Sequence, residues 1–111
     1  PHGVCCATLL VPASSATIDA LRAHDANHPA LRRYAEAGEL LSGTAGIEVL
    51  LDWLRDTVRL LRVPTISELG VRPDAFRQIA EQAAKASSTK GNPIALSVDQ
   101  LIGVLGAAAR D

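Results

Sequence analysis

The sequence predicts an all-α fold, an irregular or orthogonal bundle of five to six short helices in one domain spanning residues 1–111. Apolar residues recur at helical spacing in several segments, whereas no segment alternates apolar and polar residues as a half-buried strand does. Hydrophobic residues make up 48% of the chain but aromatic residues only 3%. A core built from Leu, Ile, Val and Ala favours packing of helix on helix.

The first 28 residues are expected to form two short helices and a loop. Helix formers and apolar residues fill positions 4–22. Pro12 lies inside this stretch and cannot donate a backbone hydrogen bond, so it should kink or split the helix. The serines at 14–15 are placed to cap the second half. Polar residues at 24–28 then indicate a loop, and Pro29 suits the first turn of the next helix.

Two amphipathic helices are predicted next. The first ends at Ser42-Gly43, and the second is capped by Thr44 and ends at Val63-Pro64. Their apolar stripes follow the helical period and should face the core. In the first helix the stripe contains Leu31, Tyr34, Ala35, Gly38 and Leu41, and in the second it contains Ile47, Leu50, Leu51, Leu54, Val58 and Leu61.

The charged residues of the second amphipathic helix are interpreted as a solvated face. Asp52, Arg55, Asp56 and Arg59 lie at spacings that suit weak surface ion pairs. We therefore do not assign these carboxylates a catalytic role.

The last third of the chain is predicted to contain a compact connector and two more helices. The connector at 65–71 should turn apolar residues inward. Pro73 begins a helix that fades near Ser87, and a polar loop follows at 88–93. Ser97 and Gln100 form a capping box for the last helix. The buried stripes of these two helices are Phe76, Ile79, Ala80 and Ala83, and then Leu101, Val104, Leu105 and Ala108.

Charge and cysteine content limit the classes of function that the chain can have. Eleven Lys and Arg residues against twelve Asp and Glu residues supply no electrostatic footprint for nucleic acid or an anionic membrane. We find no apolar run near the length of a membrane span and no signal peptide. Cys5 and Cys6 are adjacent, so no disulfide framework is expected and both are interpreted as small buried fillers. We expect a soluble, cytoplasmic protein.

Few residues suggest chemistry by themselves. His24 and His28 are four residues apart, but Asn27 and Pro29 argue against one helix holding both, so loop histidines are the preferred interpretation. His2 offers a neutral nitrogen within Pro1-His2-Gly3, although a lone histidine beside apolar residues is more often structural. No methionine occurs in the sequence, and we expect the chain to be a piece of a longer protein.

Several segments, in order, resemble the C-terminal helical domain of the iron-containing (group III) alcohol dehydrogenases, a dehydroquinate synthase-like helical domain. The connector at 63–71 matches the family's interior connector, so the likeness covers nearly the whole chain. One departure is Val11 before Pro12, where the family places the proline directly after the apolar pair. The matching segments are Pro1-His2-Gly3 with Cys6-Ala7-Thr8-Leu9-Leu10, Leu31-Arg32-Arg33-Tyr34-Ala35-Glu36, and Ala86-Ser87-Ser88-Thr89-Lys90-Gly91-Asn92-Pro93-Ile94 with Leu96.

The resemblance implies a two-domain enzyme that transfers hydride between an alcohol or aldehyde and NAD or NADP, with a divalent metal polarising the substrate oxygen. Iron is the expected metal and zinc the alternative. His2 maps onto one metal ligand, while the other ligands and the nucleotide-binding domain lie upstream of this sequence. Ser88 and Thr89 are candidates to line the alcohol site. The chain alone is expected to be inactive and to bind neither metal nor nucleotide.

Two alternatives stay open. The chain is either a free-standing helical protein-interaction module without catalysis, or part of a relative of the maleylacetate reductase or glycerol dehydrogenase type. The expected partner of the enzyme is a small alcohol or aldehyde, with no nucleic acid and no membrane. A homodimer is possible, because the apolar residues at 4–10 would be exposed in the chain alone.

Overall fold

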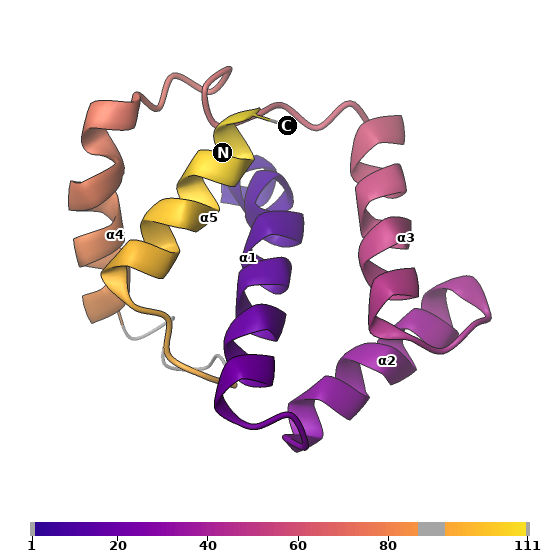
Figure 1. Cartoon of the computed structure of the whole chain (residues 1–111). Coiled ribbons are helices and arrows are strands. Elements are labelled where there is room, and N and C mark those ends of the chain that lie inside the picture. The colour runs from indigo at the N-terminus through magenta and orange to yellow at the C-terminus, as the bar shows by residue number, and fades with distance from the viewer. Residues whose placement is uncertain (1, 87–92, 111) are drawn as a thin grey trace.

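Five α-helices and one 3-10 turn form the secondary structure of residues 2–86 and 93–110, the part of the chain that the computed structural model describes (Figure 1). Within these residues there is no β-strand, so the predicted all-α fold is confirmed. The elements are α1 (His2–His24), α2 (Pro29–Ser42), α3 (Ile47–Leu60), η1 (Pro73–Ala75), α4 (Phe76–Lys85) and α5 (Val98–Arg110).

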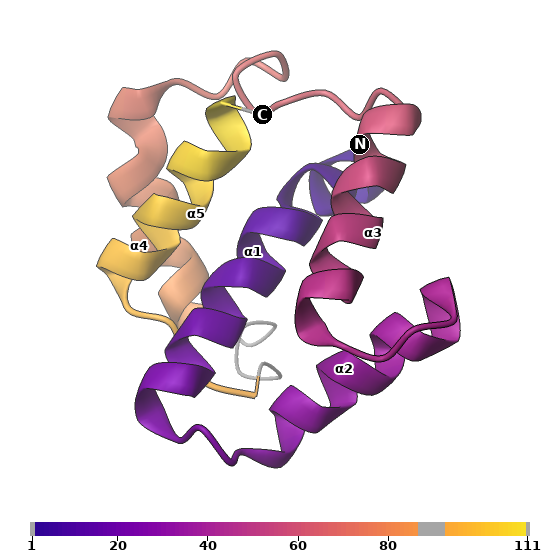
Figure 2. The same ribbon diagram turned by 45° about the vertical axis from the view of Figure 1, so that its right-hand side comes forward.

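Helix α1 lies in the middle of the fold. Helices α4 and α5 pack together on one side of it, and α2 and α3 pack together on the other (Figures 1 and 2). Two clusters of buried apolar side chains result, and α1 contributes to both. The first contains Ile18, Leu21, Ala30, Leu31 and Leu51, and the second contains Ile66, Ala80, Leu105 and Ala108, with Leu9 of α1 packed against it.

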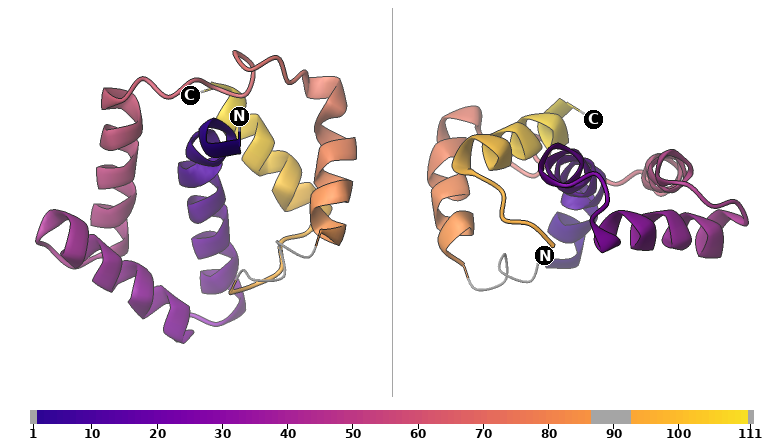
Figure 3. Two further views of the ribbon diagram at one scale, coloured as in Figure 1. Left: turned by 180° about the vertical axis from the view of Figure 1, so that it is seen from behind. Right: turned by 60° about the horizontal axis from the view of Figure 1, so that its bottom comes forward.

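Pro12 does not split α1, which contradicts the expectation of two short helices. Helix α1 is continuous over 23 residues with Pro12 inside it, and its first turns run in a different direction from the rest (Figure 3). Pro12 cannot donate to the carbonyl four residues earlier, so a bend is the expected result. Packing of Ile18 and Leu21, both fully buried, offsets that loss, and the serines at 14–15 lie inside the helix and cap nothing.

Both ends of α2 follow the sequence prediction. The His28 Nδ1 atom accepts a hydrogen bond from the backbone N–H of Ala30 at 3.0 Å, and Pro29 occupies the first helical position. Gly43 adopts φ 87°, the left-handed conformation of a helix C-cap, and its N–H donates to the Glu39 carbonyl at 2.8 Å.

The cap predicted for α3 was wrong. Gly46, not Thr44, is the N-cap residue, with φ 145°. The Thr44 N–H instead donates to the Ser42 hydroxyl oxygen at 3.3 Å, so Thr44 belongs to the preceding turn. The predicted stripes were also too long, because Leu41 is 47% and Leu61 68% exposed. Leu61 follows the last residue of α3, and the last turn of α2 extends past its contact with α3 (Figure 2).

The last third of the structure confirms the predicted connector and capping box. Ile66 is buried, and its N–H donates to the Ala108 carbonyl at 3.1 Å, which ties the connector to α5. The Ser97 N–H donates to Gln100 Oε1 at 2.7 Å, and the Gln100 N–H donates back to Ser97 Oγ at 3.1 Å. Helix α4 ends at Lys85, and the predicted fading point at Ser87 lies outside the described residues.

Gly38 allows α2 and α3 to approach closely. A Cβ atom at Gly38 would lie 2.6 Å from the Gly46 carbonyl oxygen, which belongs to the backbone and cannot move aside alone. At Gly103 of α5, by contrast, a Cβ atom would meet nothing within 4 Å.

We expect Gly38→Ala to lower the free energy of unfolding by about 1–3 kcal/mol, because the added methyl group separates the two helices. Gly103→Ala is the matched control. It should raise the free energy of unfolding by about 0.5–1 kcal/mol through helix propensity alone. Urea unfolding followed by circular dichroism measures both changes, and a neutral Gly38→Ala would show that the helices separate at no cost.

Tyr34, the only tyrosine in the chain, gives a pH-dependent signal. Desolvation by burial raises the pKa of the Tyr34 phenol above its ordinary value of 10.0. The folded state therefore holds this proton more tightly than the unfolded state. We expect the free energy of unfolding to fall as pH rises above 10, and absorbance of the phenolate reports the titration. Tyr34→Phe should remove this part of the pH dependence.

Candidate functional site

The residues that the sequence assigned to metal and substrate are His2, Ser88 and Thr89, and their side chains are not among those that the structure describes. His2 is the first residue of α1, but its side chain is not among those described. Ser88 and Thr89 lie outside the described residues altogether. Their roles therefore stay predictions.

The described side chains do not by themselves form a divalent metal site. Among them, no group of three or more His, Cys, Asp or Glu residues comes together, whereas a catalytic zinc site typically takes three protein ligands. Helix α1 ends at His24 and His28 caps α2, which confirms that no continuous helix holds both. Cys5 and Cys6 are exposed, so the prediction of buried fillers was wrong. Both lie in the part of α1 that precedes Pro12.

A groove of about 930 Å³ opens among α1, α3 and α5 in the described structure. Residues of α1 form its floor, and residues of α3 and α5 form its walls. Figure 2 shows α1 between these two helices. Small residues leave the space open, among them Ala7, Ala16, Ala20 and Ala23 of α1 and Gly103 and Ala107 of α5.

Positive charge lines the α3 wall of the groove. Arg55, Arg59 and Arg62 border it, whereas Asp19 is the one acidic residue among the described lining residues. Arg55 Nη1 lies 3.3 Å from Asp52 Oδ1, and Arg59 Nη1 lies 3.7 Å from an oxygen of Asp56. These are the exposed surface pairs that the spacing predicted. The two aspartates do not line the groove, so Arg55 and Arg59 dominate the charge of its α3 wall.

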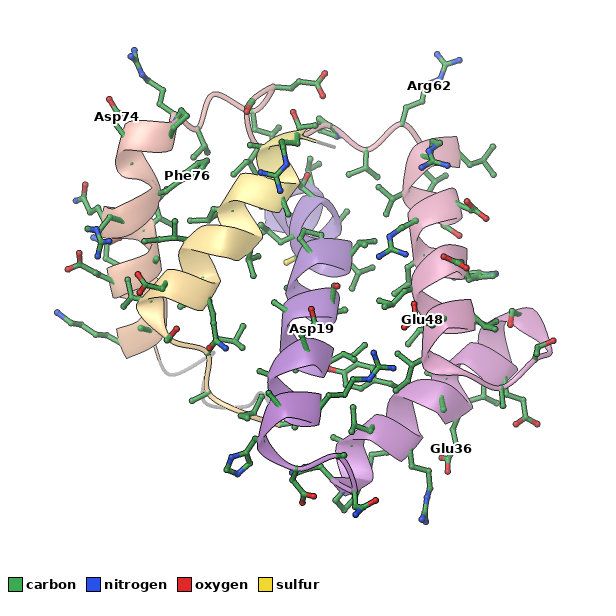
Figure 4. The ribbon with its side chains drawn as sticks, viewed as in Figure 1. Asp19, Glu36, Glu48, Arg62, Asp74 and Phe76 are labelled. Atoms are coloured by element: carbon green, nitrogen blue, oxygen red, sulfur yellow. The ribbon has the colours of Figure 1, made fainter. Side chains whose placement is uncertain are left out.

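Arg62 adopts an unusual backbone conformation. Its φ is 55°, the left-handed region in which glycine is common and other residues cost roughly 1–2 kcal/mol. The Arg62 N–H donates to the Arg59 carbonyl and the Val63 N–H donates to the Val58 carbonyl, both at 3.1 Å. These two bonds form a Schellman motif that ends α3. Figure 4 shows Arg62 extending outward beyond α3 and Asp19 on the near side of α1.

Thr8 closes the groove at one end. Its hydroxyl lies 2.9 Å from the Val4 carbonyl oxygen and 2.8 Å from the Pro64 carbonyl oxygen, and it is buried. The second contact joins the first half of α1 to the chain that follows α3. At the other end of α1, Arg22 and Glu48 lie 3.5 Å apart.

Sequence reasoning missed this groove. The signal was present in Ala16, Ala20 and Ala23 of α1, which lie four and three residues apart, and in the arginines at 55 and 59. Each pattern was interpreted only within its own helix, because neither pattern shows which helices pack on either side of α1.

The apolar character of α1 was also underestimated. Helix α1 is long enough to cross a membrane over residues 3–24, and an 18-residue window within this stretch has a mean hydropathy of 1.6, with 28% of that window buried in the described fold. This corrects the statement that no run has the required length. This finding depends only on the length and composition of the helix. Core helices of soluble proteins and signal sequences can have the same length and composition.

Comparison with known proteins yields one partial likeness. A choline dehydrogenase from Bacillus subtilis (strain 168) is 42% identical over 43 residues. The matched stretch is 39% of this chain and 11% of that relative. The likeness is thus to an oxidoreductase, over a minority of each chain. No protein-family model matches the chain, and no solved structure matches it.

We expect Thr8→Val to lower the free energy of unfolding by about 1 kcal/mol, because it removes the hydrogen bond that joins α1 to Pro64 while keeping the side-chain shape. Thr57→Val is the matched control. The Thr57 hydroxyl donates only to the Trp53 carbonyl within its own helix, at 2.8 Å, so its loss should cost less. Chemical unfolding of both variants measures the difference, and equal losses would contradict a bridging role for Thr8.

Proposed function

We propose that this chain is the C-terminal helical domain of an NAD(P)-dependent and iron-dependent alcohol dehydrogenase. The observation that carries the proposal is the partial likeness to a choline dehydrogenase, an oxidoreductase named for an alcohol substrate. The order of the family-like segments and the all-helical fold agree with it. The reaction would be hydride transfer between an alcohol or aldehyde and nicotinamide.

In this proposal the chain supplies only part of the active site. His2 would be one metal ligand, with iron the expected metal and zinc the alternative, and the remaining ligands and the nucleotide site would lie in residues outside this chain. The contribution of the described residues is positional. Thr8 and the packing of Leu9 against the second core hold the first turns of α1 in place, and with them the backbone that carries His2. Ser88 and Thr89 stay candidates for lining the alcohol site.

The other two hypotheses differ in what they predict. A relative that acts on maleylacetate or glycerol would share the metal ligand and differ only in substrate. A free-standing interaction module is favoured by one observation, the exposure of Leu40 (87%) and Leu60 (81%) on the surface of α2 and α3. Such a module would need neither His2 nor nicotinamide.

The test uses the full-length protein that contains this chain. We expect His2→Ala to lower the bound iron or zinc and to reduce NAD(P)-dependent alcohol oxidation by about 100-fold or more, because one ligand is lost. His24→Ala, at the opposite end of α1 and exposed, is the control and should keep both. Metal analysis and steady-state kinetics are the measurements.

Unchanged metal content and rate in His2→Ala would sink the assignment. A full-length protein with no nicotinamide-dependent activity and no metal would instead favour the interaction module. Activity confined to glycerol or maleylacetate would keep the role of His2 and change the substrate.

A further inference from the structure

We propose that the groove between α1, α3 and α5 binds an elongated aliphatic carboxylate, a ligand with an apolar body and one anionic end. The residues that carry this proposal all belong to the described part of this chain, so the proposal does not depend on the dehydrogenase assignment.

The shape of the groove suits an extended small molecule. Its volume of about 930 Å³ lies within the range of roughly 300–1,000 Å³ that small-molecule sites occupy. The lining of α1 runs from Ala7 to Ala23, a distance of about 24 Å at 1.5 Å per residue. At Gly103 a Cβ atom would meet nothing within 4 Å, so the α5 wall is open there. An alkyl chain lying along these small residues gains free energy in proportion to the apolar area it covers.

The charge of the groove selects an anion. Arg55 and Arg59 lie one helical turn apart and both border the groove. Their present partners, Asp52 and Asp56, form exposed pairs of little strength. A ligand carboxylate on the groove side can therefore accept hydrogen bonds from a guanidinium without breaking a strong contact.

The position of Asp19 orients the ligand. Arg59 lies in the last turn of α3, near the end of the groove at which Thr8 contacts the Pro64 carbonyl. Asp19 is eleven residues further along α1, about 16 Å away along the helix axis, and it repels a carboxylate at that end. The anionic end of the ligand therefore lies toward Arg59, and its tail points toward Ala20.

The same features exclude a quaternary ammonium such as choline as the ligand of this groove. Arginines repel a cation, and among the described lining residues there is no aromatic ring to attract one. Head-group charge is thus the property that an experiment should vary.

The test is calorimetric titration of the full-length protein that contains this chain with octanoate and with octylammonium, which share a tail and differ in charge. We expect octanoate to bind and octylammonium to bind on the order of tenfold more weakly or not at all. Arg55→Gln and Arg59→Gln should each weaken octanoate binding by up to roughly tenfold. Arg33→Gln, an exposed arginine of α2 outside the groove, should leave it unchanged.

A second variant tests the location without touching charge. Gly103→Leu places a side chain in the open space of the groove and should abolish octanoate binding, while the chain stays folded because leucine favours a helix. Circular dichroism checks the fold. The proposal is overturned if octanoate does not bind at millimolar concentration, if octylammonium binds equally well, or if folded Gly103→Leu binds octanoate as the original chain does.

Discussion

The burial of α1 on two sides is the constraint on which the rest of the structure depends. Ile18 and Leu21 are fully buried in the cluster shared with α2 and α3, and Leu9 packs against the cluster shared with α4 and α5. Because one helix serves two cores, it must be long, and it must tolerate Pro12 in its interior. The lost backbone hydrogen bond bends α1 instead of ending it, since side-chain burial on both sides of the bend contributes more than one bond.

The groove follows from the same arrangement. Helices α3 and α5 both pack against α1, and they face each other across its alanines. Large side chains at these positions would fill the space, whereas alanine and glycine leave it open. The contact of Thr8 with the Pro64 carbonyl closes one end, and it lies beside the arginines that end α3. The shape and the charge of this end of the groove therefore both result from the way in which α3 and the chain after it pack against α1.

The two functional proposals draw on different parts of the molecule. Dehydrogenase chemistry would take one ligand from the start of α1 and everything else from residues outside this chain. Carboxylate binding would use only described residues of α1, α3 and α5.

Local sequence determined the helices and most of their ends. Periodic apolar residues, Pro29 and Gly43 around α2, and the Ser97–Gln100 box act within a few residues, so their effects are visible in the sequence. The exposure of Cys5, Leu41 and Leu61, the continuity of α1 through Pro12 and the groove itself were decided only by tertiary structure. Each depends on which helix lies beside a given face, and that neighbour is distant in the sequence. For the same reason His2 was identified through a resemblance between segments, while the arginine-lined groove became visible only when three helices were seen together.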